Sequence, residues 1–192
     1  METIIRQEIK RTADVLIALA QDNALISTIG FVSNLCINAL KNGNKILFAG
    51  NGGSAADSQH LAAELVSRFN YDRPGLPAMA LTTDTSILTA IGNDYGYENL
   101  FSRQIKALGK KGDVFIGLST SGNSQNILKA IETAKALSID TIGFTGSRPC
   151  ELTNISDHCI QVPSSDTPKI QEGHIVIGHI ICGLIEQNMF PK

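Results

Sequence analysis

His60 and Glu64 stand four residues apart in a segment that predicts a helix, so both side chains lie on one face of it. A histidine and a carboxylate on one face can bind a metal ion or transfer a proton, although a lone helical histidine is more often structural. The pair follows a buried strand, Ile46–Ala49, and a glycine loop, Gly50–Ser54, and its helix starts near Ala55. Small residues before a helix let backbone N–H groups approach an anion. The unit therefore combines a binding loop with a candidate catalytic pair.

A second group of candidate residues lies near the carboxyl end of the chain, where residues 169–188 predict the final helix. His179 stands there among isoleucines, and its helical angle places Glu172 on the same face, with Gln171 further round. Two histidines and a carboxylate can hold Zn²⁺ with an open position, and they can equally transfer protons as an acid/base pair. No spacing rule connects His60 with His179, so only the fold decides whether they meet.

A hydroxyl-rich loop follows another predicted strand, Asp113–Leu118, and leads into a helix from Gln125 to about Leu137. Hydroxyl groups donate hydrogen bonds, and a helix amino terminus favours an anion. The loop is therefore the better phosphate candidate, and the glycine loop Gly50–Ser54 then lines the rest of the ligand. The four hydroxyl residues are Ser119, Thr120, Ser121 and Ser124.

A polar turn, Gly92–Gly96, is predicted between the short helix Thr85–Ile91 and a helix over Tyr97–Leu108. Asn93 and Asp94 in such a turn often serve local geometry alone. The turn nevertheless follows a strand–helix unit, where α/β proteins place ligand loops. These two side chains are therefore further candidates for ligand contact.

The elements that must position these residues alternate between strands and helices, which predicts an α/β fold with a parallel sheet covered on both faces. In such folds ligands bind at the carboxyl ends of the strands. Two helices within residues 1–42 precede the first strand, and they either cover the sheet or form an oligomer surface. The remaining strands are expected at Ala78–Leu81, Thr141–Thr145 and Cys159–Val162.

Composition excludes several classes of protein. The chain has 192 residues, enough for one domain, with a formal net charge of −2 and no basic run, so a nucleic-acid partner is not expected. No apolar run reaches membrane-spanning length, so no membrane is expected. The motifs GxGxxG, GxxxxGK[ST] and GxSxG are absent, which argues against dinucleotide binding, nucleotide hydrolysis and a serine hydrolase.

The four cysteines predict a reducing compartment. They show no CxxC spacing, and three lie in apolar surroundings, which favours buried free thiols over disulfides or a zinc cluster. The first ten residues, METIIRQEIK, carry charges where a signal peptide needs an apolar core. We therefore expect a cytoplasmic protein.

Four stretches together resemble the sedoheptulose 7-phosphate isomerases of the sugar isomerase (SIS) superfamily. They are GNGGSAADSQHLAAEL, LTAIGNDYGYENLFSRQ, GDVFIGLSTSGNSQNILKA and IQEGHIVIGHIICGLIE. The similarity covers essentially the whole chain, residues 1–192, as one SIS domain. It implies a three-layer α/β/α sandwich with a five-stranded parallel sheet and two extra N-terminal helices. It also implies a homotetramer with active sites at subunit interfaces and the N-terminal pair in oligomer contacts.

The resemblance implies conversion of sedoheptulose 7-phosphate, a ketose, to the aldose D-glycero-D-manno-heptose 7-phosphate. This is the first step of bacterial ADP- or GDP-heptose synthesis for lipopolysaccharide or other surface glycans. Glu64 and His179 would be catalytic, and one Zn²⁺ per subunit would be held by His60, Glu64, Gln171 and His179. The family pattern thus selects Gln171 over Glu172, the choice from helical angle. The implied substrate contacts are Asn51, Gly52, Gly53, Glu64, Asn93, Asp94, Ser119, Thr120, Ser121, Ser124 and Gln171.

An alternative comes from another class. Some SIS proteins are non-catalytic and bind the bacterial replication initiator, and the stretch LTTDTSILTAIGND also resembles that group. Those proteins lack the carboxylate matching Glu64 and the histidine matching His179. Because this chain has both, the enzyme is the favoured prediction.

Overall fold

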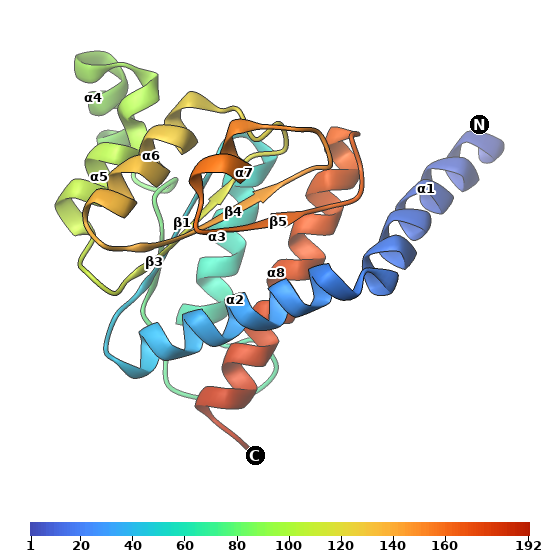
Figure 1. The fold of residues 1–192 in the computed structure, drawn as a ribbon, viewed down its shortest axis with the longest axis horizontal. Coiled ribbons are helices and arrows are strands. Elements are labelled where there is room, and N and C mark those ends of the chain that lie inside the picture. Colours follow the sequence, from blue (N-terminus) through green and yellow to red (C-terminus); the bar gives the residue numbers. More distant parts are fainter.

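The computed structural model describes residues 1–192 as an α/β sandwich around one parallel sheet (Figure 1). The five strands lie in the order β2-β1-β3-β4-β5, and every neighbouring pair is parallel. This confirms the predicted fold class. The strands are β1 (Ile46–Gly50), β2 (Ala78–Ala80), β3 (Val114–Leu118), β4 (Asp140–Thr145) and β5 (His158–Gln161).

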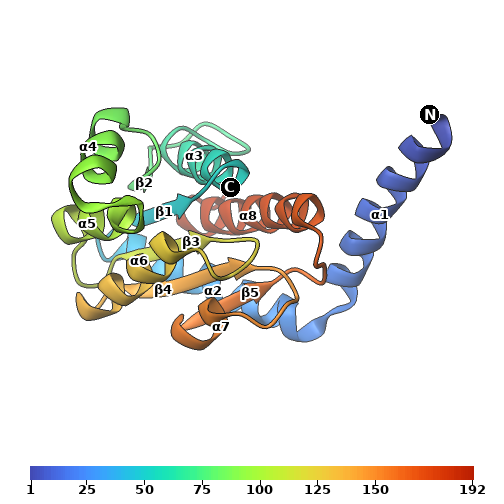
Figure 2. The same ribbon diagram turned by 90° about the horizontal axis from the view of Figure 1, so that it is seen from above.

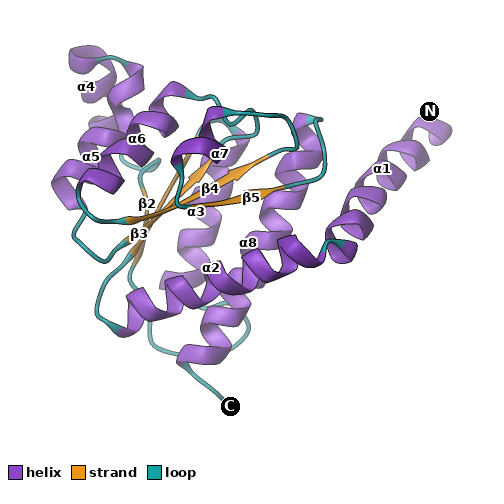
Figure 3. Cartoon of the chain, in the orientation of Figure 1, coloured by secondary structure: helices purple, strands orange, loops and turns teal.

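Helices cover both faces of the sheet, as the view from above shows (Figure 2). One layer contains α2 (Asn23–Lys41), α3 (Gly53–Val66) and α8 (Thr167–Met189). The opposite layer contains α4 (Thr85–Tyr95), the 3₁₀ turn Tyr97–Asn99, α5 (Leu100–Leu108), α6 (Gln125–Ala136) and α7 (Glu151–Ile155). The loops that end the strands gather at one edge of the sheet (Figure 3).

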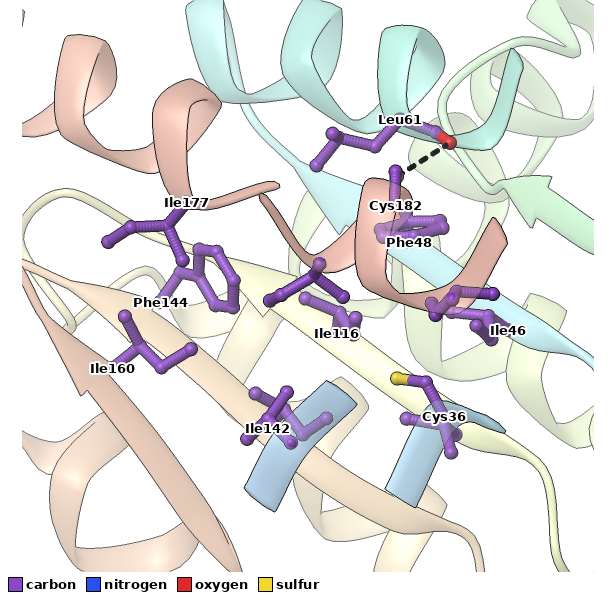
Figure 4. Close-up of a cluster of buried hydrophobic side chains, with 14 of the residues drawn as sticks. Cys36, Ile46, Phe48, Leu61, Ile116, Ile142, Phe144, Ile160, Ile177 and Cys182 are labelled. Carbon is purple, nitrogen blue, oxygen red and sulfur yellow. Dashed lines mark hydrogen bonds between the residues drawn. The ribbon is translucent and has the colours of Figure 1, made fainter. Parts of the chain in front are cut away.

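The core consists of two apolar clusters, one on each face of the sheet. Alternate residues of β1 point to opposite faces, so Ile46 and Phe48 pack beneath α3 and α8 while Leu47 faces the other layer. Figure 4 shows the first cluster, in which Leu61 of α3 lies beside Cys182 of α8. Close packing between these two helices sets the positions of the side chains they carry.

The two N-terminal helices differ in their packing. α1 (Glu2–Gln21) extends away from the body in both views, and its Ile4, Ile5 and Ile9 are more than half exposed (Figures 1 and 2). α2 is long and apolar enough to cross a membrane by length and composition alone, contrary to the expectation from sequence. Eight residues of α2 are nevertheless buried in the domain, and it packs along α8. The apolar character of α2 is thus used in the core.

Several predicted boundaries shift by one to three residues, and one prediction is wrong. Residues 92–95 are helical, so the first four residues of the predicted turn Gly92–Gly96 form the last turn of α4. The Asp84 side chain caps this helix by accepting from the Ile87 N–H, and Gly96, with φ of 87°, ends it. Only Gly96 has the left-handed backbone that ends the helix, so Gly92 continues it.

Candidate functional site

His60, Glu64 and His179 converge on the outer side of the α3–α8 pair. The two histidine Nε2 atoms lie 2.8 Å apart, and His60 Nε2 lies 3.1 Å from Glu64 Oε1. All three ligand atoms fall within 4.8 Å of one another, so they could hold one metal ion. His60 Nε2 carries at most one proton and cannot donate fully to both neighbours at once. A cation bound between the three side chains would accept a lone pair from each of His60 Nε2, His179 Nε2 and the Glu64 carboxylate.

Helix packing produces this convergence. Gly178 lies against Leu61, and a Cβ at position 178 would stand only 2.5 Å from a Leu61 methyl group. Glycine therefore lets α8 approach α3 closely, one residue away from both histidines. The Phe69 ring packs beside the His179 ring with 5.6 Å between centroids. The structure thus brings together two histidines that no sequence spacing connects.

Gln171 and Glu172, the two other candidate residues of α8, lie away from the cluster of His60, Glu64 and His179. Gln171 sits against Gly53 at the start of α3, about 12 Å along the helix from His179 at about 1.5 Å per residue. It is not part of the three-residue cluster, and its role as a fourth ligand stays a prediction. The choice of Glu172 as the partner of His179 is wrong, because its carboxylate accepts hydrogen bonds from Thr12 and Lys169. Helical angle does not reveal which neighbouring element lies beside a face.

The loop after β3 forms a compact hydroxyl cluster. Ser119 Oγ lies 2.9 Å from Ser124 Oγ and 3.5 Å from Ser121 Oγ, and it accepts from the Gly122 N–H. The Ser124 side chain does not cap α6, which leaves first-turn N–H groups of that helix for another acceptor. Gly122 is required here, since its φ is 65° and a Cβ would strike Cys150. The loop has the form of an anion site.

Asn51 is held by a network that sequence reasoning missed. Its amide exchanges two hydrogen bonds with Asn126, at 2.9 and 2.8 Å, and its oxygen also accepts from the Tyr97 hydroxyl at 2.9 Å. Asn126 is buried in α6, and an asparagine in the first turn of the helix after the hydroxyl loop is the available signal. The oxygen of Asn51 accepts two hydrogen bonds and its amide donates one, so one N–H of the amide is left for a further acceptor.

Two cavities meet at Asn51 and Tyr97. One, of about 720 Å³, includes Ser124 and Asn126 in its lining. The other, of about 460 Å³, includes Gly52 and residues of α4 and α5. Ser124, at the end of the hydroxyl loop, and the glycine loop therefore line adjoining spaces.

Asn93 and Asp94 do not join these cavities. Both lie on α4, where the Asn93 amide donates to the Asp94 carboxylate at 2.8 Å. Asp94 lines a separate groove between α4 and α5, together with Arg103. Their assignment to substrate contact stays a prediction.

The candidate metal cluster, His60, Glu64 and His179, is separate from the two cavities within one chain. Neither cavity is lined by His60, Glu64 or His179. His179 instead borders a shallow groove of about 350 Å³ beside Ile180 and Leu184, whose side chains are 46 % and 39 % exposed. Apolar side chains left exposed around a candidate site residue indicate a surface that another molecule covers.

Asp57 is a further polar residue that the sequence reasoning did not single out. It lies one turn before His60 on α3, and its buried Oδ2 has no hydrogen-bond partner. Burial raises the pKa of this carboxyl, and the nearby His60 opposes the shift. His174, by contrast, is structural: it is buried, and its ring lies 3.1 Å from the Thr145 carbonyl oxygen.

Comparison with known proteins agrees with this architecture. The profile of the SIS domain matches residues 9–146. The chain is 59 % identical over 190 residues to the phosphoheptose isomerase of Burkholderia pseudomallei, covering 99 % of this chain and 96 % of that protein. It is 57 % identical to the phosphoheptose isomerase of Aneurinibacillus thermoaerophilus, with the same coverage. The solved phosphoheptose isomerase of Neisseria gonorrhoeae superposes with a TM-score of 0.91 at 38 % identity, over 97 % of this chain and 98 % of that one.

These similarities extend from the N-terminal helices to the last helix, so they span the segments that carry the candidate site residues. They favour the isomerases over the initiator-binding alternative. With identity this high over the full length, the chain belongs to the phosphoheptose isomerase family of SIS-domain proteins.

Proposed function

We propose that this protein is an isomerase that converts sedoheptulose 7-phosphate to D-glycero-D-manno-heptose 7-phosphate, the first step of bacterial heptose synthesis. The observation that carries the proposal is the full-length identity of 59 % with a phosphoheptose isomerase. The geometry agrees, because the chain carries both parts that such a reaction needs: a carboxylate that converges with two imidazoles, and a hydroxyl-rich loop at the start of a helix.

The chemistry is a proton shift between adjacent carbons. Glu64 removes a proton from C1 of the ketose while an acid protonates the C2 oxygen, which yields an enediol. Glu64 then returns the proton to C2 as the C1 hydroxyl loses its own, which leaves the aldose carbonyl at C1. His179 is assigned as the acid and base at the oxygens, since its ring lies in the cluster that contains Glu64. Its Nε2 is the atom within the cluster, so Nδ1 would have to carry this proton whenever Nε2 binds a metal.

We propose zinc as the bound metal, held by His60, Glu64 and His179, with Gln171 as the proposed fourth ligand. Two imidazole nitrogens and one carboxylate oxygen are a donor set typical of catalytic zinc with an open position. Bound there, the ion polarises the sugar oxygens during enolisation. A carboxylate has two oxygens, so Glu64 can offer Oε1 to the metal side and keep the other for the proton.

The phosphate end of the substrate is assigned to the hydroxyl loop and the amino end of α6, and the sugar to residues 51–53. Hydroxyl and backbone donors at a helix start bind phosphate without needing a lysine. Asn93, Asp94 and Gln171 remain proposed contacts toward the sugar.

We propose that a second copy of the chain completes each site in a homotetramer. Two observations support this: the metal cluster and the cavities are separate in one chain, and α1 leaves Ile4, Ile5 and Ile9 exposed. The N-terminal helical pair of residues 1–42 would then lie in oligomer contacts. A cytoplasmic location is proposed because all four cysteines are free thiols.

An isomerase assay with sedoheptulose 7-phosphate tests the proposal. The purified protein should turn over the ketose, lose activity on chelation and regain it with zinc. Glu64→Gln should reduce kcat by at least two orders of magnitude, because the amide cannot accept the proton. Glu132→Gln is the matched control, since Glu132 is exposed on α6 away from the cluster. Full activity of Glu64→Gln would rule out the assigned base.

A further inference from the structure

A buried ion pair joins α8 to the loop that follows α3. Arg73 Nε lies 3.1 Å from Glu186 Oε1, and the two side chains are 2 % and 0 % exposed. The Glu186 carboxylate also accepts from the Phe69 N–H at 2.8 Å and the Asn70 N–H at 2.7 Å. Burial raises the pKa of Glu186, but these two N–H groups and Arg73 outweigh it and hold the pKa below its ordinary value. The carboxylate is therefore charged and fully partnered.

The same arginine caps the end of α3. Its guanidinium donates to the Glu64 carbonyl at 2.8 Å and to the Leu65 carbonyl at 2.6 Å. Backbone carbonyls in the last turn of a helix have no partner within the helix. Arg73 supplies a donor to the Glu64 carbonyl and shares the Leu65 carbonyl with the Leu76 N–H. Arg73 thus bonds to α3 on one side and to α8, through Glu186, on the other.

These contacts lie directly beside the metal cluster. Glu64 supplies both a cluster ligand atom, through its carboxylate, and the carbonyl that Arg73 holds. Phe69, whose N–H bonds Glu186, packs its ring against His179. Glu186 follows His179 by seven residues on α8, so both lie on nearly the same side of that helix. The pair therefore ties the end of α3 to α8 two turns from the histidines.

A buried ion pair is weak support for stability, because desolvation offsets much of its attraction. Its best-attested use is to fix how two elements are aligned. We propose that Arg73 and Glu186 are positioning residues that fix the alignment of α3 against α8 and so hold His60, Glu64 and His179 together. The inference rests on the proposed metal site and adds to it the residues that shape it.

The chain offers a matched control for this idea. Lys45 and Asp113 form another ion pair, 2.6 Å apart, in which the Asp113 side chain is 1 % exposed. Asp113 also accepts from the Lys45 and Lys110 N–H groups. This pair joins the starts of β1 and β3, away from the cluster. Its loss should affect stability without affecting the histidines.

The experiment compares Arg73→Lys with Asp113→Asn. Lysine keeps the charge but lacks the planar fork that reaches two helices at once. Zinc affinity, measured by competition with a chromogenic chelator, should fall at least tenfold for Arg73→Lys and stay within twofold for Asp113→Asn. At saturating zinc, kcat should fall for Arg73→Lys while KM stays within twofold, because the cavity residues lie on other elements or, like Ala55, at the opposite end of α3 from the residues that Arg73 contacts. Should Arg73→Lys keep both zinc affinity and kcat within twofold of the wild type, the proposal is wrong.

Two additions make every outcome decisive. If Arg73→Lys does not fold, as judged by circular dichroism, the double substitution Arg73→Met with Glu186→Leu replaces it, since it leaves no unpaired charge. The NMR signals of the His60 and His179 rings in zinc-free protein give a readout that needs neither metal nor turnover. They should shift in the Arg73 variant and not in Asp113→Asn. A wild type that binds no zinc would overturn the metal site, whereas unshifted ring signals would overturn the positioning role.

Discussion

The Asn51 side chain is oriented by two hydrogen bonds to Asn126 of α6, at 2.9 and 2.8 Å, and by one from the Tyr97 hydroxyl. Replacing Asn126 with leucine removes the first two and leaves only the bond from Tyr97. A hydrogen bond contributes a net free energy of about 1 kcal/mol. Asn126→Leu therefore lowers the free energy that holds the Asn51 side chain in its orientation by about 2 kcal/mol. If Asn51 must keep its orientation in the transition state, kcat/KM falls about 30-fold. Tyr97→Phe removes one bond and should cost about fivefold.

The control is another buried amide. Gln104 is 6 % exposed and donates to the Leu81 and Leu100 carbonyls, so Gln104→Met also removes two hydrogen bonds. Both variants should lower the melting temperature by about 4–8 °C, as expected for about 2 kcal/mol in a chain of this size. Only the Asn126 and Tyr97 variants should lower kcat/KM in the steady-state isomerase assay. If Asn126→Leu keeps kcat/KM within threefold while its melting temperature falls like that of Gln104→Met, the positioning of Asn51 is not catalytically important.

Three further predictions concern pH, metal and thiols. Burial lowers the pKa of the His174 ring to about 4 in the folded protein, whereas the same ring in the unfolded chain takes up a proton near pH 6.5. The free energy of unfolding should therefore fall by about 3 kcal/mol between pH 6.5 and pH 4, and His174→Gln should reduce that fall in urea titrations. Zinc at 100 times its dissociation constant should stabilise the protein by about 2.7 kcal/mol, and a thermal scan unchanged by chelator would argue against the site. Burial raises the pKa of Cys159 and Cys182 to about 12 and that of Cys36 above its ordinary value, so a disulfide reagent should modify these thiols slowly until the protein unfolds.

The local elements of the site follow from sequence alone. The spacing of His60 and Glu64 places both on one face of a helix wherever that helix packs, because helical periodicity is set by backbone geometry. The hydroxyl loop Ser119–Ser124 likewise stands at a helix start for local reasons. Alternating strands and helices also predict the parallel sheet, since parallel strands need crossover helices between them.

The error at residues 92–96 shows where local reasoning fails. Glycine, asparagine and aspartate are compatible both with a turn and with the last turns of a helix. The Asp84 cap and the left-handed Gly96 decide the matter, and α4 therefore carries Asn93 and Asp94 away from the cavities. Sequence contains these signals, but it does not rank them against the competing turn residues.

Contacts between distant residues depend on tertiary packing. The approach of His179 to His60 needs α8 to lie along α3, with Gly178 against Leu61 and the Arg73–Glu186 pair at the far end. Helical angle favoured Glu172, whose carboxylate instead meets Thr12 of α1. Periodicity determines which side chains share a face, and only the packing of one helix against another determines what that face meets.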